Sequence, residues 1–195
     1  ADMTRCTVHG CVRSVLQLLI KHRWFGKNKW ASSIEEAGNL TRFRTVICKN
    51  PLADRGLDKV FMGRRYLRVL DLTGTGIRHI PGSIALLHHL RLLNLSLTQI
   101  MELPESIESL RNLQFLLLRC CNGLHSLPEG ISKLHNLQCL DLEGSAPQLV
   151  LPSLVDLKQL TTLRGFIVNH KEVTEKDVSG WPLEDLEHMN SLRSL

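Results

Sequence analysis

The motif Leu-x-x-Leu-x-Leu recurs along the chain at a nearly constant interval, and this periodicity restricts the fold more than any other feature. Its copies begin 23 or 24 residues apart, at Leu67, Leu90, Leu113, Leu137 and, in a weaker form, Leu160. A series of prolines repeats in the same phase: Pro81, Pro104, Pro128 and Pro152. Because two independent series agree, each interval is expected to be one structural unit.

Each unit has the pattern of a strand followed by a turn. The motif alternates as a short β-strand does, with its leucines pointing inward and the residues between them outward. Eight residues after the first leucine comes a small polar or thiol residue, expected to bind buried backbone groups where the chain turns inward: Thr75, Thr98, Cys121 and Ser145. Each proline breaks any helix begun before it, and apolar residues three apart, such as Ile84 and Leu87, favour a short helical or 3-10 turn.

One such unit cannot bury its own leucines, but a stack of units can. The sequence therefore predicts an α/β fold, a leucine-rich-repeat solenoid with a curved parallel β-sheet on its concave face and short helical or 3-10 turns and loops on its convex face. About eight repeats are expected, four to five of them regular. The chain divides into irregular basic repeats at 1–66, regular repeats of 23–24 residues at 67–168, and a longer irregular repeat at 169–195, which is truncated.

Weaker copies of the pattern occur outside the regular block. Leu40-x-x-Phe43, followed by apolar residues at 46 and 47, fits a strand, and so does the segment 3–8. Apolar residues at 12, 15, 16 and 19 fit one face of a helix. Leu192-x-x-Leu195, after a helical pattern near Leu186, predicts the start of another strand.

The composition supports a folded domain with an aliphatic core. Leucine accounts for 38 of the 195 residues, apolar residues for 43% and aromatic residues for only 5%. No apolar stretch reaches 18 residues, so no membrane-spanning helix is predicted. The six cysteines are expected to be free thiols in a reducing compartment, because the chain shows no secretory signal pattern.

The formal net charge of +5 is unevenly distributed along the chain. Residues 1–66 carry +8 and residues 67–195 carry −3, which indicates surfaces with different partners. The basic segment lacks the aromatic interleaving and the modules of nucleic-acid-binding proteins. A solvated surface, or a contact with an acidic neighbouring domain, is therefore favoured over nucleic-acid binding.

The outward strand positions are the candidate binding residues of such a solenoid. Read down the stack, they give an apolar centre with a polar rim, which is the anatomy of a protein interface. The predicted concave partner-binding residues are Asp71, Leu92, Asn94, Leu97, Phe115, Leu117, Arg119, Asp141, Glu143 and Arg164. We expect Phe115→Ala or Leu117→Ala to leave folding intact and to weaken partner binding by about 2 kcal/mol. The alternative explanations are a neighbouring domain that covers the patch, or a chance scatter of apolar residues on the surface.

No catalytic or metal site is predicted. Gly74 and Gly76 follow a strand, but the third glycine of a dinucleotide-binding fingerprint is replaced by His79. The cysteines and histidines between residues 120 and 139 match no zinc spacing, and Cys121 already has a place in the repeat. We therefore expect a protein that is not an enzyme, with no metal and no cofactor in this chain.

Residues 66–75 read Y-L-R-V-L-D-L-T-G-T and are followed by I-P-G-S-I at 80–84. Similar runs are L-P-E-S-I at 103–107, L-R-N-L-Q at 110–114 and L-P-E-G-I at 127–131, with L-T-T-L-R-G-F-I-V at 160–168 and M-N-S-L-R at 189–193. These runs closely resemble the repeats of plant intracellular nucleotide-binding leucine-rich-repeat (NB-LRR) disease-resistance proteins of the coiled-coil class. The resemblance covers essentially the whole chain and is specific to the class, not to one receptor.

The resemblance implies a recognition domain that senses pathogen effectors or guarded host proteins in the plant defense response and helps to keep the receptor autoinhibited. It places the nucleotide-binding domain, and its nucleotide, upstream of this chain. Arg42, Arg44, Arg64 and Arg65 would then form an interdomain basic surface facing that domain by charge complementarity. The implied location is the cytoplasm, with the nucleus or a membrane periphery as further sites of the full receptor.

Other repeat classes share part of the pattern. A cytosolic leucine-rich-repeat scaffold of Ras-type signalling has L-P-x-x-I turns and a 23-residue period, but it should be regular throughout. An extracellular leucine-rich-repeat receptor ectodomain of plants prefers a period of 24 and a G-x-I-P turn, whereas three of the four turns here end in Leu-Pro. The substrate-recognition arm of a ubiquitin ligase is a third option.

Overall fold

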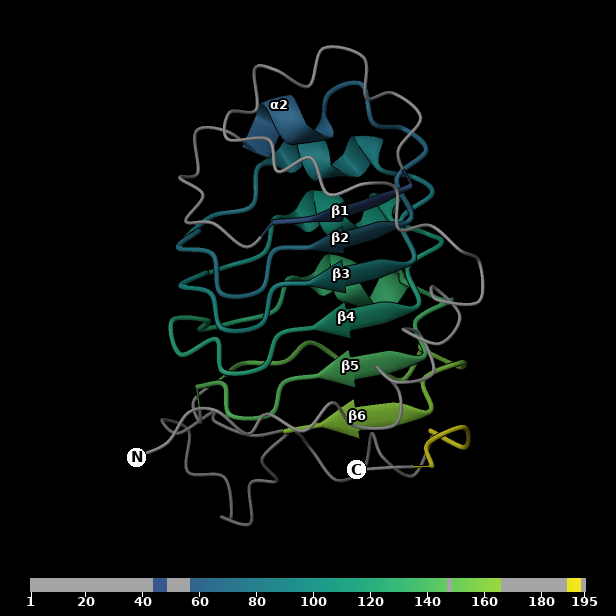
Figure 1. Cartoon of the computed structure of the whole chain (residues 1–195). Coiled ribbons are helices and arrows are strands. Elements are labelled where there is room, and N and C mark those ends of the chain that lie inside the picture. The colour runs from purple at the N-terminus through teal and green to yellow at the C-terminus, as the bar shows by residue number, and fades with distance from the viewer. Residues whose placement is uncertain (1–43, 49–56, 147–148, 166–188, 194–195) are drawn as a thin grey trace. The chain divides into compact units, whose positions relative to one another are not determined.

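One short strand per repeat builds the sheet of this protein. The structure, a computed structural model, describes residues 44–48, 57–146, 149–165 and 189–193, all within the unit Ala37–Leu195 (Figure 1). Its strands form one parallel sheet in chain order: β1 (Thr45–Ile47), β2 (Val69–Asp71), β3 (Leu92–Asn94), β4 (Phe115–Leu117), β5 (Cys139–Asp141) and β6 (Thr162–Arg164). This arrangement confirms the predicted leucine-rich-repeat solenoid.

The strands pair in the register that the sequence repeat predicts. Residues at the third motif position are partners along the row, from Val69 through Leu92, Phe115 and Cys139 to Thr162. The next residue of each strand points to the other side of the sheet. In these five strands it is a fully buried leucine: Leu70, Leu93, Leu116, Leu140 and Leu163. The alternation thus separates an aliphatic core from an outward face.

The first strand is present, but its phase differs from the expected one. We expected a motif that begins at Leu40, with Phe43 as its second apolar residue. Instead, Val46 pairs with Leu70, the fourth residue of its motif, so the first motif begins at residue 43. A strand with one buried side has its register fixed by which side chains must face the core, and Val46 meets that requirement.

A further repeat follows β6 where the sequence predicts one. The backbone N–H of Arg193 donates to the carbonyl of Thr161 at 2.8 Å. The same bond joins equivalent residues of the regular repeats, for example Thr161 to Gln138 at 2.9 Å. The ladder therefore continues to the motif that starts at Leu192. The elements predicted at 3–19, at 166–168 and near residue 186 lie outside the described residues.

Short helices stack on the side of the sheet away from the viewer (Figure 1). Three of them are 3-10 helices, as the phase of the prolines predicts: η3 (Gly82–Leu86), η4 (Glu105–Ser109) and η5 (Glu129–Lys133). Each is preceded by a proline with φ between −72° and −68°, and each buries one isoleucine: Ile84, Ile107 and Ile131. An α-helix, α2 (Leu57–Phe61), packs beside η3. No helix among the described residues is long and apolar enough to cross a membrane.

A ladder of small polar side chains lies where each strand turns inward, as predicted. Thr75 and Thr98 each donate a hydroxyl hydrogen bond of 2.6 Å to the carbonyl three residues earlier. Cys121 Sγ lies 3.2 Å from the carbonyl oxygen of Leu95, in the preceding repeat. Ser145 Oγ accepts the N–H of Cys121 at 3.2 Å. The two threonine bonds thus close the turn within their own repeat, whereas the contacts of Cys121 and Ser145 tie one repeat to the next.

Candidate functional site

Strand pairing brings the predicted partner-binding residues into neighbouring columns. Leu92 and Phe115 are partners at the third motif position. Arg119 and Glu143 lie two residues beyond β4 and β5, and Leu97 lies in the turn after β3. The remaining five share the fifth motif position: Asp71, Asn94, Leu117, Asp141 and Arg164. All ten residues thus lie on the outward face of the sheet or in the turns that follow it, while their role in binding stays a prediction.

The expected apolar centre is less exposed than its sequence pattern suggested. Leu92 is 6% exposed and Leu117 is 2% exposed, and Phe115 is half-buried. Leu97 is the exposed member of the four, at 48%. A residue of an inner strand is flanked by side chains of both neighbouring strands, about 4.8 Å away; Leu92, for example, lies between Val69 and Phe115.

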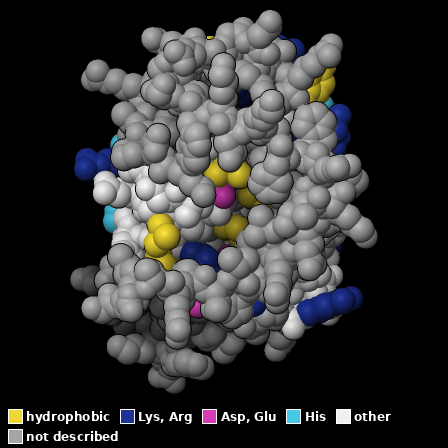
Figure 2. Space-filling view, viewed as in Figure 1, with side chains coloured by type: hydrophobic (Ala, Val, Ile, Leu, Met, Phe, Trp, Pro, Cys, Tyr) yellow, Lys and Arg dark blue, Asp and Glu magenta, His cyan; other side chains and the backbone are white. Residues whose placement is uncertain are grey.

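The burial of Leu117 changes what its substitution should do. Truncation of a buried leucine removes the packing contacts of its side chain, so Leu117→Ala is expected to lower the stability of the fold although Leu117 lies on the outward face, contrary to the expectation from sequence. Leu97 is exposed, so its substitution is not expected to remove buried packing in this way. Figure 2 shows the described part of this face, where apolar side chains lie beside acidic and basic ones.

Three of the fifth-position residues hold the turn that follows their own strand. In each, Oδ1 accepts the backbone N–H two residues on, at 3.0 or 3.1 Å: Asp71, Asn94 and Asp141. Such Asx turns fix the bend at the strand end. In β4 the equivalent residue is Leu117, which cannot accept, and the N–H of Arg119 donates to Ser96 Oγ of the preceding repeat at 3.3 Å. The three polar residues therefore have a structural role besides the predicted one.

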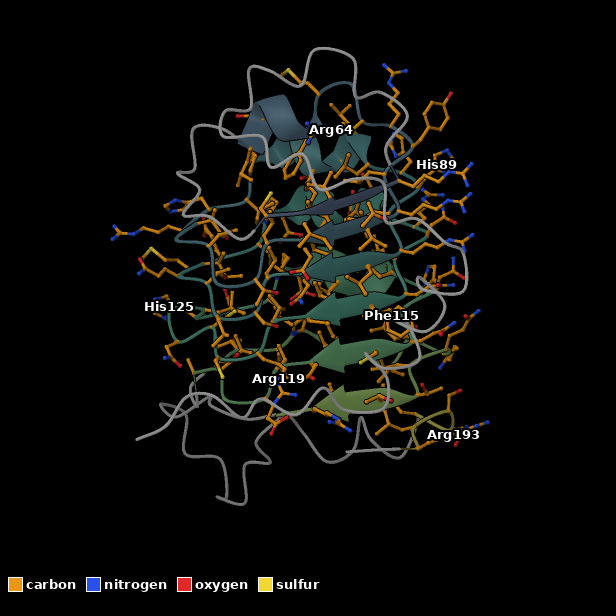
Figure 3. The ribbon with its side chains drawn as sticks, viewed as in Figure 1. Arg64, His89, Phe115, Arg119, His125 and Arg193 are labelled. Carbon is orange, nitrogen blue, oxygen red and sulfur yellow. The ribbon has the colours of Figure 1, made fainter. Side chains whose placement is uncertain are left out.

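Arg119 connects the turns after β4 and β5. Its Nη2 lies 2.9 Å from Glu143 Oε2, and its Nη1 lies 3.5 Å from Asp141 Oδ2. The side chain of Asp141 is 5% exposed and that of Glu143 is 51% exposed, so Arg119 neutralises a buried carboxylate and orients an exposed one. Figure 3 shows Arg119 at the carboxyl ends of the strands, whereas Phe115 lies nearer to their amino ends.

The residue after Arg119 and its equivalents adopt a left-handed backbone conformation. This eighth motif position has a φ of 69° at Gly74 and 72° at Gly144. It is also left-handed at Leu97, with a φ of 59°, and at Cys120, with a φ of 54°. The turn geometry therefore requires positive φ in all four repeats, whichever residue is present.

Three of the four basic residues that we predicted as one interdomain surface lie among the described residues, and their role stays a prediction. Arg42 lies outside the described residues, and Arg65 is exposed. Arg44 is exposed and precedes β1, whereas Arg64 lies close enough to Cys48, after β1, for the two groups to influence each other's pKa. Burial lowers the pKa of the half-buried Arg64.

A different set of arginines forms a column at the amino ends of β1 to β3. Arg44, Arg68 and Arg91 share the second motif position and are all exposed, and Arg68 N donates to Arg44 O at 2.7 Å. Desolvation, and then repulsion from its two neighbours, lowers the pKa of Arg68. Within the described residues, none of the ion pairs involves this column. The rings of Tyr66 and His89, which directly precede Leu67 and Leu90, are stacked with their centroids 6.0 Å apart. His89 is labelled in Figure 3.

The arginine column is a feature that the sequence analysis missed. Arg44 and Arg64 both belong to the basic segment 1–66 and were therefore predicted to share a surface, although they do not share a motif position. The sequence does contain a signal for the column, because Arg68 and Arg91 both stand directly after the first leucine of their motifs, at the second motif position.

The segment 120–139, which contains several cysteines and histidines, is arranged as part of the repeat. Cys121 is fully buried, and burial raises the pKa of its thiol. His125 is exposed and points away from the sheet (Figure 3). Cys48, Cys120, Cys121 and Cys139 are not joined in disulfide bonds. In the part of the chain that the structure describes, no group of His, Cys, Asp or Glu is arranged to hold a metal ion.

Solved structures of other repeat proteins are similar to this chain. One is the leucine-rich-repeat ectodomain of the plant membrane receptor kinase GASSHO1/SCHENGEN3 from Arabidopsis thaliana, in complex with CASPARIAN STRIP INTEGRITY FACTOR 2. It is 26% identical with a TM-score of 0.59, and the match covers 82% of this chain and 19% of that one. The Arabidopsis receptor kinase HAESA, in complex with the peptide hormone IDA and the co-receptor SERK1, is 27% identical with a TM-score of 0.58, covering 69% of this chain and 23% of that one.

A bacterial protein shows the same fold. An internalin (inlF) from Listeria monocytogenes is 23% identical with a TM-score of 0.54, covering 70% of this chain and 38% of that one. This chain thus spans less than half the length of each of the three similar structures. No curated protein matches it.

A family model described as a leucine-rich repeat region matches residues 59–195, which is more than half of the chain. This range contains β2 to β6, whose register follows the repeat. Domains of this kind are protein-interaction scaffolds whose binding surface is the outward face of the stack. The chain belongs to the leucine-rich repeat family.

Proposed function

We propose that this chain is the non-catalytic protein-recognition domain of a plant intracellular immune receptor of the NB-LRR class. It would sense a pathogen effector or a guarded host protein, and it would help to keep the receptor inactive in their absence. One observation carries the proposal: a row of turns at the carboxyl ends of β3 to β5 presents chemically different side chains, Leu97, Arg119 and Glu143, from one rigid sheet.

The turn row is well suited to protein recognition because its backbone is already ordered. Leu97 N donates to Arg119 O at 2.8 Å, and Cys120 N donates to Glu143 O at 2.9 Å. A preorganised surface loses little conformational entropy on binding. The similar plant ectodomains were solved with protein or peptide ligands in the complex, which is consistent with recognition by this type of fold.

The intracellular receptor class is supported by the sequence of the repeats. The period is 23 or 24 residues, three of the four turns end in Leu-Pro, and the runs at 66–75 and 103–107 resemble this class. A location in the cytoplasm follows from the same resemblance and is part of the proposal.

The basic surfaces support a contact with an acidic part of the same receptor. The column of Arg44, Arg68 and Arg91 presents three positive charges on one side of the sheet, and the half-buried Arg64 lies next to exposed Arg65 at residues that follow α2. Complementary charge guides and orients such contacts. We propose that these residues face the receptor's nucleotide-binding domain and contribute to autoinhibition.

The test is effector-independent cell death in leaf tissue that expresses the full-length receptor. Two double variants reverse the proposed contacts, Arg64→Glu with Arg65→Glu and Arg68→Glu with Arg91→Glu. The control is Arg111→Glu, which changes an exposed arginine outside both groups. Asn136 Nδ2 donates to the main-chain carbonyl of Arg111, so this bond does not depend on the side chain that is changed. We expect spontaneous cell death from the double variants and not from the control. Cell death at the wild-type level for both double variants, at equal protein abundance, would rule out the autoinhibitory role.

An extracellular receptor ectodomain is the second candidate function. The observation in its favour is the similarity to the GASSHO1/SCHENGEN3 and HAESA ectodomains, at TM-scores of 0.59 and 0.58. The two candidates differ in where the full-length protein lies in the cell. A fluorescent-protein fusion of the full-length gene product that labels the cytoplasm supports the intracellular receptor, and one that labels the cell surface supports the ectodomain.

A further inference from the structure

Leu97 occupies a position where the repeat geometry suits glycine. The eighth motif position is left-handed in the turns after β2 to β5, and glycine is present at Gly74 and Gly144. Glycine adopts positive φ freely, whereas a residue with a Cβ is strained there. Leu97, with a φ of 59°, and Cys120, with a φ of 54°, therefore each lower the stability of the fold relative to glycine.

Cys120 is compensated by packing, but Leu97 is not. Cys120 is half-buried, and its Sγ lies 3.0 Å from the point where a Cβ on Gly144 would stand, so it packs beside that glycine. Leu97 is 48% exposed, and it is the largest apolar residue that the turn row presents to solvent among the described residues. Strained residues of this kind concentrate at functional sites, where the surroundings maintain them for a contact outside the fold.

Open space lies beside Leu97 on the side of the preceding repeat. Gly74 N donates to Ser96 O at 2.9 Å, which holds the two turns next to each other. A Cβ added to Gly74 would meet no described heavy atom within 4 Å, and this glycine is exposed. Leu97 therefore lies next to an exposed residue without a side chain. We call Leu97 and Gly74 the leucine step.

The charges near the leucine step are already engaged within the protein. Arg119, in the next turn, lies within ion-pair distance of both Asp141 and Glu143. On the other side, Asp71 Oδ1 accepts both the N–H and the hydroxyl of Thr73, at 3.0 and 2.5 Å. A charged partner group would have to break these contacts or lose its own hydration without replacement, whereas an apolar side chain would not. The chemistry of the step thus favours an apolar group.

We infer that the leucine step binds an apolar side chain of a protein partner, and that Leu97 determines specificity within the recognition face. The inference rests on the proposed function as a protein-recognition domain. The occupant is a peptide segment of the partner that places an aliphatic or aromatic side chain on Leu97, next to Gly74. Leucine in place of glycine at this position lowers folding stability and supplies the contact.

A random dodecapeptide library displayed on phage, selected on the 195-residue chain, tests this inference without a known partner. The selected peptides are then synthesised, and their dissociation constants are measured by fluorescence anisotropy on the wild type and three variants. Leu97→Asn keeps a residue that tolerates left-handed φ and removes the apolar side chain. Leu97→Gly removes the side chain and the strain. Cys120→Gly, the matched control, relieves the same strain at a position outside the leucine step.

We expect the selected peptides to share an aliphatic or aromatic residue. Their affinity should fall about tenfold or more on Leu97→Asn and Leu97→Gly, as at an interface hot spot, and stay within about threefold on Cys120→Gly, since that variant keeps the apolar contact. Urea midpoints of both Leu97 variants should be no lower than that of the wild type. Equal affinity for wild type and Leu97→Asn would overturn the inference and leave the proposed function standing, because the peptides would then bind another surface. Failure of any peptide to bind the wild type would count against both.

Discussion

Ser145 offers the sharpest test of how the repeats are held together. Its Oγ donates to the carbonyl of Leu118 at 2.5 Å and accepts the N–H of Cys121 at 3.2 Å, both in the preceding repeat. Leu118 and Cys121 are fully buried. The change Ser145→Ala removes both partners at once, without adding bulk, so that two backbone groups are left unpaired in the turn after β4.

The size of the effect follows from the number of unpaired groups. A buried polar group without a partner costs about 1–3 kcal/mol, and the half-buried position of Ser145 lets water replace part of the loss. We therefore expect Ser145→Ala to lower the free energy of unfolding by about 2 kcal/mol. With a urea m-value of about 2 kcal/mol per molar, the unfolding midpoint should fall by about 1 M.

Two further variants make the measurement specific. Ser132→Ala removes a hydroxyl that donates only to the exposed Glu129 carbonyl, at 2.7 Å, so its free energy of unfolding should change by less than about 0.5 kcal/mol. Ser145→Thr keeps the hydroxyl, as Thr75 and Thr98 do at the equivalent positions, and should stay near the wild type. Urea unfolding followed by far-ultraviolet circular dichroism gives all four midpoints. A midpoint shift for Ser145→Ala no larger than that for Ser132→Ala, at an unchanged m-value, would refute the reasoning.

Three other predictions concern close packing, charge and pH. Gly130→Ala would place a Cβ 2.7 Å from the carbonyl oxygen of Glu105, so its melting temperature should fall by several degrees through overpacking of about 1–3 kcal/mol. The matched change Gly76→Ala meets no described atom within 4 Å and should melt within about a degree or two of the wild type. Arg119→Met leaves the buried carboxylate of Asp141 without its cation, and the free energy of unfolding measured in urea should fall by about 2 kcal/mol. Glu143→Gln changes a side chain that is 51% exposed, so its free energy of unfolding should fall by less than about 1 kcal/mol. Equal losses for the two variants would contradict the assigned roles. Burial raises the pKa of Cys121 above its usual value of 9.0, so only the unfolded thiol ionises just above that pH, and stability should fall there as the pH rises. Cys121→Thr should show a smaller fall between pH 9 and 10 in urea titrations, and an unchanged slope would exclude a contribution of this thiol.

The sheet was predictable because each strand is specified by residues within one repeat. Alternation fixes which leucines point inward, and the constant interval fixes which residues become partners, so the row from Val69 to Thr162 follows from the sequence. Thr98 and Cys121 were predictable for a related reason, since a turn toward the core needs a buried hydrogen-bonding side chain. The phase of β1 was not predictable, because its segment offers two possible motifs. Apolar residues at 40 and 43 fit one phase, and apolar residues at 43 and 46 fit the phase that the structure adopts.

The candidate site was harder to predict because it depends on contacts between repeats. Leu92 and Leu97 have the same residue type, yet the first is flanked within the sheet and the second projects from a turn with glycine on one side. The Asx turn at Asp141 is local, since it binds the N–H two residues on, but the ion pair of Asp141 with Arg119 joins residues 22 positions apart. Motif columns identify such residues as neighbours, but they do not show which side chain already has a partner.

Stacking by backbone bonds explains how such a surface can vary without loss of the fold. The turn after β3 is tied to the turn after β4 through main-chain atoms, Leu97 N to Arg119 O, so the bond survives a change of either side chain. The inward ladder is different, because there the side chains of Thr98, Cys121 and Ser145 make the bonds themselves. Substitutions at the outward turn positions should therefore alter recognition at little cost in stability, with Ser96 and Arg119 as exceptions. Ser96 Oγ accepts the N–H of Arg119, and the side chain of Arg119 also neutralises the buried Asp141. In this domain the residues best able to change specificity are those whose side chains the stack does not use, and Leu97 meets that condition.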